Sequence, residues 1–413
     1  MKRRRGGVTM NLHNGQLYWP ETYTNTGEYP VLEEDISCDV LIVGGGMAGA
    51  LCAHVLGQEK ELDVVLIDRR HPGAGSSSAN TGLLQFSSDK MLHELIEQQG
   101  EQDAVYFYQL CLQALEDLKK MTSGLSEDPE FREQKSLYYA SSPEDTLKLE
   151  REYEALKKYD FPVEYLEPQE ISSRFPFSKP AAIVTSGDAD VNPYKCVQIL
   201  LKDAAASGVR IFEHTPLIRK TKTVHGFTCE SEKGTISARY VIFATGYEND
   251  FLAQQLGADL NRSYAIVTEP IPSLKTWYEE WMIWETKRPY LYMRTTIDGR
   301  IVAGGLDEDK AEAPLNEGLI EERGERILQK IKEHFPDLTP KISHSWCATF
   351  GESHDGLPYI GEHPNRLGEY YCLGFGGNGT VYSMLGATII KDLITKGFHP
   401  ASRLFTIARA VSL

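Results

Sequence analysis

Three glycines at a fixed spacing form the strongest chemical signal in this sequence. Gly44, Gly46 and Gly49 make a GxGxxG turn between an apolar run at 39–43 and a stretch of helical character at 50–58. In such a turn the first glycine permits a tight bend, the second lets the backbone approach a pyrophosphate, and the third lets the helix pack closely on the strand. The free N–H groups at the start of the helix then bind phosphate oxygens. The spacing therefore predicts a dinucleotide site.

A second buried strand ends in an acidic residue and completes the unit. Residues 63–68 read Asp-Val-Val-Leu-Ile-Asp, so Asp68 stands at the end of that strand. A carboxylate at this place accepts hydrogen bonds from a ribose hydroxyl. The two strands and the helix fit in about 30 residues, as a parallel βαβ unit requires. The alternative is a plain βαβ unit with an incidental glycine turn.

A loop rich in glycine and serine follows the second strand, at 73–82. Its hydroxyls and N–H groups can contact further phosphate and ring atoms of a dinucleotide, although a flexible solvent loop would have the same composition. A nicotinamide-binding domain would normally continue with more βαβ units at short intervals, so the loop favours FAD over NAD. The other candidate cofactor-binding residues in this first part of the chain are Met47, Ala48, Arg69, Ser76, Ser77, Asn80, Thr81, Gly82 and Leu83.

Four groups of segments together resemble the D-amino-acid oxidase or glycine oxidase-like (DAO) family of FAD-dependent oxidoreductases, over about residues 36–400. They are VLIVGGGMAGALCAHVL with VVLID, GSSSANTGLL, the pair GVRIFEHTPL and RYVIFATGY, and DGLPYIG with YYCLGFGGNGTVYSMLGATII. The stretch that begins LYWPETY is loosely similar to the γ-glutamylputrescine oxidase branch. The resemblance adds these candidate flavin contacts: Leu217, Ala244, Thr245, Gly246, Ile360, Gly376, Gly377, Asn378, Gly379 and Thr380.

The glycine-rich turn at 376–379 precedes an apolar helix that we expect to begin near Thr380. The N-terminus of that helix would point at the cofactor. Reduced flavin carries negative charge, which a helix N-terminus stabilises by about 0.3–2 kcal/mol. The alternative is a turn that only reverses the chain.

The resemblance implies that an arginine binds a substrate carboxylate. Arg294 lies in the matching strand, and a guanidinium donates two parallel hydrogen bonds to a carboxylate. Strand alternation places Tyr290, Tyr292 and Arg294 on one face. An ordinary arginine on a solvated face would fit the same pattern. We also expect Tyr264 and Tyr292 to shape the substrate pocket.

The family's chemistry predicts oxidation of a C–N bond of an amino acid or amine. Hydride would pass to flavin N5, and the resulting imine would hydrolyse. The electron acceptor, O2 or another, stays open. Two alternatives are a dehydrogenase that oxidises the C–O bond of a 2-hydroxy acid or glycerol phosphate, and a flavin-binding redox subunit without turnover.

Three positions differ from relatives with other properties. Ala79 occupies the place of a histidine to which some relatives attach FAD, and Cys347 lies near, without clear alignment, the cysteine that carries FAD in monomeric sarcosine oxidases. We therefore predict non-covalent FAD and an inert, buried Cys347. Val381 stands where those oxidases place a lysine, which weakens any prediction of sarcosine-like activity.

These motifs require an α/β architecture of two interleaved domains. We expect a Rossmann-like FAD-binding domain of the GR2 type from 36–90, 185–250 and 345–400. An α+β substrate domain, on a mixed or antiparallel sheet, is expected from 126–184 and 255–344. The small-molecule site should lie between the domains, over the flavin ring.

Outside the motifs, four stretches have a readable local pattern. Residues 89–121 are predicted to be helical with a break near Gly100, and 194–206 and 316–334 are predicted helices. Residues 11–35 are rich in aromatic and turn-forming residues. They predict either an irregular arm that lies on the body of the protein or a loosely ordered leader.

Composition excludes several other classes of protein. The chain has 413 residues with 59 acidic and 43 basic side chains, a net charge of −16 that argues against nucleic acid as a partner. Seven widely spaced cysteines without a CxxC predict reduced thiols. The histidines at 344, 354 and 363 fit no metal site.

Because no apolar stretch follows the basic tip Lys2–Arg5, or reaches the about 20 residues of a membrane span, we predict a cytoplasmic protein. Met10 is an alternative start, and an oligomer is possible.

Overall fold

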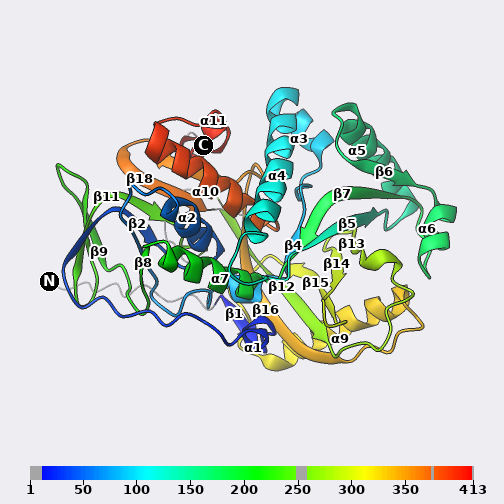
Figure 1. The fold of residues 1–413 in the computed structure, drawn as a ribbon. Coiled ribbons are helices and arrows are strands. Elements are labelled where there is room, and N and C mark those ends of the chain that lie inside the picture. Colours follow the sequence, from blue (N-terminus) through cyan, green and yellow to red (C-terminus); the bar gives the residue numbers. More distant parts are fainter. Residues whose placement is uncertain (1–11, 248–257, 374–375, 412–413) are drawn as a thin grey trace.

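The computed structural model describes residues 12–247, 258–373 and 376–411, and in it the chain forms two sheets that lie side by side (Figure 1). Each sheet takes strands from several separate stretches of sequence, so the two domains are interleaved as predicted. The basic tip, Met10 and the predicted domain boundary between 250 and 255 lie outside the described residues.

The eight-stranded sheet carries the glycine turn, in the order β17-β18-β11-β2-β3-β8, with β10 on β11 and β9 on β10. Its strands are β2 (Ile36–Val43), β3 (Val64–Ile67), β8 (Arg210–Phe212), β9 (Arg219–Lys222), β10 (Phe227–Glu230), β11 (Thr235–Phe243), β17 (Tyr359–His363) and β18 (Arg366–Leu373). The central strands are parallel. Helices α2 (Met47–Gly57), α7 (Pro193–Ala206) and α10 (Gly379–Lys396) cover one face (Figure 1). Residues of β10 contribute to the core on the other face, which explains why β2 and β3 read as continuous apolar runs.

The ten-stranded sheet is mixed, because β5 and β13 run parallel and the other pairs are antiparallel. Its strands are β1 (His13–Gly15), β4 (Leu83–Leu84), β5 (Arg132–Tyr139), β6 (Val163–Leu166), β7 (Ala182–Asp190), β12 (Ala258–Thr268), β13 (Met282–Glu285), β14 (Leu291–Thr295), β15 (Ile301–Glu308) and β16 (Ile342–Ser353). Helix α9 (Glu317–His334) packs on β12, β15 and β16.

The remaining helices lie outside these two layers. They are α1 (Trp19–Thr22), α3 (Leu92–Gln99), α4 (Glu101–Thr122), α5 (Thr146–Lys158), α6 (Pro168–Arg174), α11 (Ser402–Phe405) and α12 (Ala408–Val411), with short 3-10 turns at Ser76–Ala79, Pro143–Asp145 and Tyr278–Glu280. The break between α3 and α4 falls at Gly100, where φ is +90°, as the sequence predicts.

Two strands cross the predicted domain boundaries, and a third pairs in the other sheet. β7 runs unbroken through the boundary at 184/185, and β16 runs through the boundary at 344/345 and pairs along its length with β12. β4 lies within the predicted FAD segment 36–90 but pairs with β7 of the ten-stranded sheet. The boundaries were predicted from proline and charge composition. Cross-strand pairing decides which sheet a strand belongs to, and the paired strands extend past the predicted boundaries.

The aromatic stretch near the N-terminus is an ordered arm. β1 pairs with β16, and the Trp19 side chain, 1% exposed, donates its indole N–H to the Asn80 carbonyl at 2.6 Å. The His13 ring lies 3.1 Å from the Ala74 carbonyl. The arm thus fastens the Gly/Ser-rich loop to the ten-stranded sheet, in agreement with the first of the two predicted alternatives.

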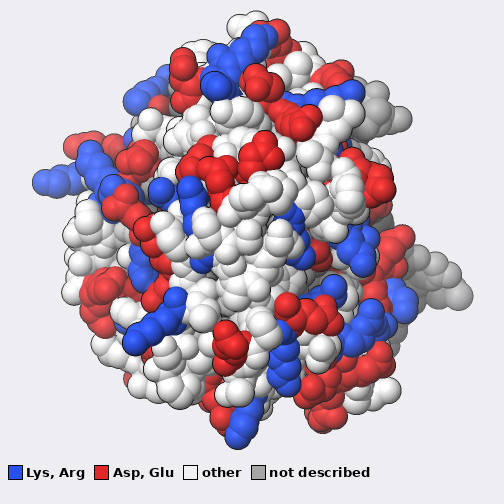
Figure 2. Space-filling view, turned by 90° about the vertical axis from the view of Figure 1, so that its right-hand side faces the viewer, with Lys and Arg blue, Asp and Glu red and all other residues white. Residues whose placement is uncertain are grey.

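Two surface features bear on possible partners. On the face in Figure 2, basic and acidic side chains are interspersed, and the basic ones do not gather into a broad patch. Among the described residues, no helix is long and apolar enough to cross a membrane.

Candidate functional site

A first cavity of about 420 Å³ opens where β2, β3 and β11 end. Ligands of open parallel sheets bind at this edge, because the strands there run into turns rather than into further pairing. Gly44, just after β2, has φ +106°, and a Cβ on it would lie 2.5 Å from the Ala244 carbonyl oxygen. A Cβ on Gly49 would lie 1.7 Å from the Gly44 carbonyl oxygen. Both glycines are therefore required for the roles that their spacing predicted.

Side chains from two loops support this turn. The Asp68 carboxylate accepts the Gly45 N–H at 2.7 Å and the Arg70 N–H at 2.8 Å. Burial raises its pKa, and these two N–H groups oppose the rise. The Ser77 hydroxyl accepts the Met47 N–H at 2.9 Å, at the start of α2.

Most predicted cofactor residues line one of two adjoining cavities. Those in the first cavity are Gly44, Gly46, Met47, Ala48, Asp68, Arg69, Ser76, Ser77, Asn80, Leu217, Ala244, Thr245, Gly246, Gly379 and Thr380. Those in the second are Thr81, Leu83, Gly376, Gly377 and Asn378.

Three predicted cofactor residues line neither cavity in the described part of the chain: Gly49, Gly82 and Ile360. Gly49 acts through the helix–strand contact. Gly82 has φ +76°, and its carbonyl accepts the Val191 N–H at 3.0 Å, so it shapes the loop rather than touching a ligand. Ile360 is fully buried in the core near α10, and the expectation that it contacts flavin is wrong.

The residues that line the first cavity are suited to bind FAD. A Cβ on Gly46 would meet only the Ser77 hydroxyl, at 3.2 Å, so the backbone there faces open space that a pyrophosphate needs. The buried Ser76 hydroxyl has no hydrogen-bond partner among the described residues, as expected of a group that serves a ligand. The N-termini of α2 and α10 both reach the cavity, which suits a negatively charged cofactor.

The second cavity, of about 160 Å³, continues from the first and shares Ser76, Asn80, Tyr247 and Gly379 with it. Residues of the ten-stranded sheet and of the glycine-rich turn meet there, with Tyr247, which follows β11. Its aromatic and acidic lining residues are Asp89, Tyr247, Trp284, Tyr290, Tyr292, Asp307 and Phe350. None of its described lining residues is Lys, Arg or His.

The glycine-rich turn before α10 is tied to the opposite wall. The Asn378 amide donates to the Gln85 carbonyl at 2.5 Å, and the Gly377 N–H donates to the Asp89 carboxylate at 2.9 Å. These bonds hold the start of α10 at the junction of the two cavities.

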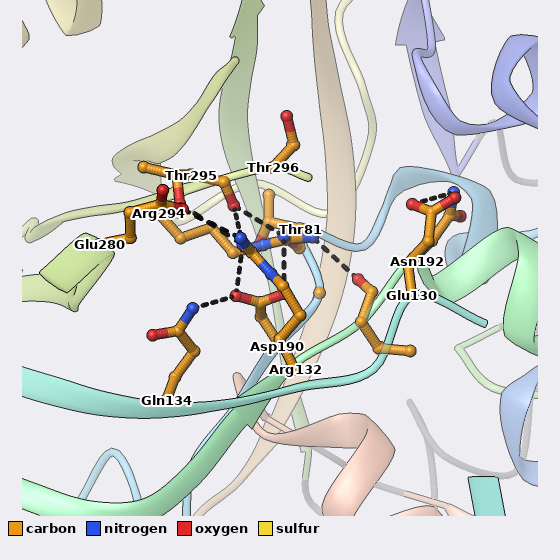
Figure 3. Close-up of polar contacts among 12 residues, drawn as sticks. Thr81, Glu130, Arg132, Gln134, Asp190, Asn192, Glu280, Arg294, Thr295 and Thr296 are labelled. Carbon is orange, nitrogen blue, oxygen red and sulfur yellow. Dashed lines mark hydrogen bonds and ion pairs between the residues drawn. The ribbon is translucent and has the colours of Figure 1, made fainter. Parts of the chain in front are cut away.

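Arg294 does not reach the second cavity, so its predicted role as a carboxylate anchor needs correction (Figure 3). Its side chain is 3% exposed and donates to the carbonyls of Thr81 at 2.8 Å, Val191 at 2.8 Å and Thr295 at 3.1 Å. It also pairs with Asp190 at 3.4 Å. The guanidinium is thus committed to fastening β14 to the Gly/Ser-rich loop and to β7.

The two tyrosines that were predicted to shape the substrate pocket lie in different places. Tyr292 lines the second cavity, whereas Tyr264 is 1% exposed in the core on the opposite face of β12, against Cys347. Its neighbour Ser263 faces the cavity instead. The expectation for Tyr264 is wrong. The sequence gives the alternation of side chains along a strand, but it does not show which of the two faces lines the cavity.

Sequence reasoning missed five cavity residues: Asp89, Tyr247, Trp284, Asp307 and Phe350. A signal existed for Tyr247, which follows the Ala-Thr-Gly turn directly. The others stand in segments without a motif and meet only through tertiary packing.

The residues considered for covalent flavin or metal lie as follows. Cys347 is fully buried in the substrate-domain core, where burial raises its thiol pKa to about 12, and it lines neither cavity among the described residues. Ala79 lines the second cavity, and Val381 is fully buried. The described residues hold no cluster of three or more metal-ligating side chains, and all seven cysteines are free.

We expect acid precipitation of the purified protein to release one FAD per chain into the supernatant. Ala79 has no nucleophile, and the Cys347 thiol lies in the core with its thiolate form disfavoured. Absorbance of the supernatant and the mass of the denatured chain measure the outcome. Flavin retained on the chain would contradict this prediction, and Cys347→Ala would then locate the link.

Comparison with known proteins identifies the fold and the cofactor. A family model for FAD dependent oxidoreductases (DAO) matches residues 39–393. The chain is 25% identical to glycine oxidase of Bacillus subtilis (strain 168), over 86% of this chain and 92% of the relative. It is 24% identical to a protein of the same strain named as a Rieske 2Fe-2S iron-sulfur protein, YhfW, over 95% of this chain and 75% of that one.

Among solved structures, the crystal structure of glycine oxidase from Geobacillus kaustophilus has the same fold, with a TM-score of 0.76 at 22% identity over 88% of this chain and 96% of that one. The architecture predicted from the sequence is therefore confirmed. Because the family model covers most of the chain, the chain belongs to the DAO family of FAD-dependent oxidoreductases.

Proposed function

We propose that this enzyme oxidises a C–N bond of an amine or amino acid. The observation that carries the proposal is the second cavity, which continues from the cofactor cavity and is closed by strands of the ten-stranded sheet and by the glycine-rich turn before α10. The relatives named glycine oxidase support it. When bound, FAD supplies a flavin ring that accepts a hydride.

The chain's own residues would position the substrate and keep water out. The cavity presents the rings of Trp284, Tyr290 and Tyr292, which can hold the substrate's carbon skeleton with its α-carbon in near-attack geometry. The α C–H bond breaks as hydride leaves, the nitrogen lone pair forms C=N, and water later adds to release a carbonyl and an amine or ammonia. None of these steps requires a side-chain base.

The charge of the cavity favours an amine over a 2-hydroxy acid or a glycerol phosphate. A 2-hydroxy acid or a glycerol phosphate carries an anion that needs cationic side chains, and none of the described residues lining the second cavity supplies one.

We expect anaerobic addition of an amine or amino acid to bleach the flavin absorbance of the holoenzyme. A panel of amines, amino acids, 2-hydroxy acids and glycerol phosphate is screened by absorbance, and each product is identified as a carbonyl compound. Bleaching by hydroxy compounds alone would favour the C–O alternative. No bleaching by any of them would favour a redox subunit without turnover.

A further inference from the structure

The acidic groups around the second cavity lack cationic partners. Asp89 and Asp307 line that cavity, and Glu352 lines a third cavity of about 340 Å³. The described residues give none of these three carboxylates an ion pair. In the described part of the chain, the buried Asp307 Oδ1 has no hydrogen-bond partner, and neither has the indole N–H of Trp284, a cavity residue that is only 8% exposed. Buried polar atoms without partners point to a ligand.

The second and third cavities form one path. They share Asp89, Tyr290, Asp307, Phe350 and Gly376, so a molecule that extends out of the second cavity passes between these carboxylates. An extended substrate would therefore place its far end beside Asp307 and Glu352.

Two cations also line the third cavity, but their hydrogen bonds and ring contacts are with other groups. The Lys90 ammonium donates to Gln98 at 2.9 Å and to the His354 carbonyl at 3.0 Å. The Arg288 guanidinium stacks over the Tyr290 ring at 4.4 Å and donates to the main-chain carbonyl of Asp89 at 3.0 Å. Negative charge is thus in excess along the path.

The electrostatics of the carboxylates agree with this excess. Burial, then the charge of Asp89, raises the pKa of Glu352 to about 7, and Arg288 opposes the rise. Burial also raises the pKa of Asp307 to about 6, with Asp89 adding to the rise and Ser263 and Arg288 opposing it. A bound cation would relieve the repulsion among these groups.

We infer that the preferred substrate is an amine with a second positive charge in place of a carboxylate. Its reacting C–N bond lies in the second cavity, and its distal ammonium binds Asp307 and Glu352 at the mouth of that cavity. This inference rests on the proposed function. The aromatic rings along the path suit an alkyl chain that ends in an ammonium group. An α-amino acid would bring its carboxylate among like charges, and Arg294 is committed elsewhere.

Three probes of equal chain length separate the possibilities: 1,4-diaminobutane, butylamine and 4-aminobutanoate. Their distal groups are cationic, neutral and anionic. We expect kcat/KM for the diamine to exceed that for butylamine about tenfold, and 4-aminobutanoate to be the poorest. Calorimetry on dithionite-reduced holoenzyme, which cannot oxidise the amine, should show the same order in Kd.

Asp307→Asn should lower kcat/KM for the diamine about tenfold, mainly through KM, and leave butylamine within about twofold. Asp337→Asn, the same change at an exposed position after α9, is the matched control and should alter neither substrate. If Asp307→Asn loses its flavin or its melting transition, Glu352→Gln provides the same measurement from the other side of the mouth.

The outcomes distinguish the two proposals. If the enzyme oxidises butylamine, 4-aminobutanoate or glycine as well as the diamine, and Asp307→Asn changes nothing, the inference is overturned while C–N oxidation stands. An equal loss for diamine and butylamine in Asp307→Asn also overturns it, because the carboxylate would then act at the reacting end. If no amine or amino acid reduces the flavin, the proposed function itself fails.

Discussion

Gly46→Val should yield a folded protein that purifies without FAD. The backbone of Gly46 has φ −79°, which valine adopts without strain, and the added side chain would project into the first cavity. Overpacking against a ligand that cannot shift costs at least about 3 kcal/mol, or on the order of a hundredfold in Kd. Flavin absorbance of the purified protein, followed by titration with FAD, measures the loss.

The matched control is Gly124→Val. Gly124 is exposed after α4, and the nearest atom to its added Cβ is the Met121 carbonyl oxygen at 3.5 Å, an ordinary contact. This variant should stay yellow. Circular dichroism and a melting curve show that both variants are folded. A yellow Gly46→Val protein would mean that the dinucleotide does not pass over the glycine turn.

Arg294→Ala should lower the free energy of unfolding by about 3 kcal/mol. The change leaves the Thr81 and Val191 carbonyls without this donor, and it removes one of two arginines that pair with the 1% exposed Asp190, the other being Arg132 at 2.8 Å (Figure 3). Arg294→Lys should recover only part of the loss, because one ammonium cannot reproduce the fork of donors. Urea unfolding of the holoenzyme gives the measurement.

Arg403→Ala serves as the control for removing an arginine. Arg403 pairs with Asp103 at 2.5 Å on the surface, with its side chain 55% exposed, so its loss should lower the free energy of unfolding far less than the loss of Arg294. If Arg294→Ala is as stable as this control and raises KM only for carboxylate substrates, Arg294 is a substrate anchor after all, contrary to its contacts.

The FAD half of the site could be predicted from sequence because local geometry fixes it. The roles of Gly44 and Gly49 follow from a bend and a close approach within one βαβ unit, and both distances agree. The helix break at Gly100 and the helix at 193–206 likewise follow from short-range pattern. The resemblance of four groups of segments to the DAO family predicted the other residues of the cofactor site.

The substrate half could not be predicted, because long-range pairing decides it. The face of β12 that looks into the cavity depends on its partners β15 and β16, so Ser263 rather than Tyr264 lines the wall. Arg294 shares a strand face with Tyr292, but Thr81 and Val191 approach it from loops far away in sequence. Asp307 and Phe350 lie in no motif.

The pairing of β1 with β16 has a consequence for the order in which the protein can fold during synthesis. His13 pairs with Ala348, so the first described strand waits for a partner made near the end of translation. At about 5–20 residues per second the wait is on the order of tens of seconds. The eight-stranded sheet is also completed late, by β17 and β18. Neither sheet can be completed on a growing chain, so β11, which pairs with β18, keeps one edge open until the last quarter of the chain emerges.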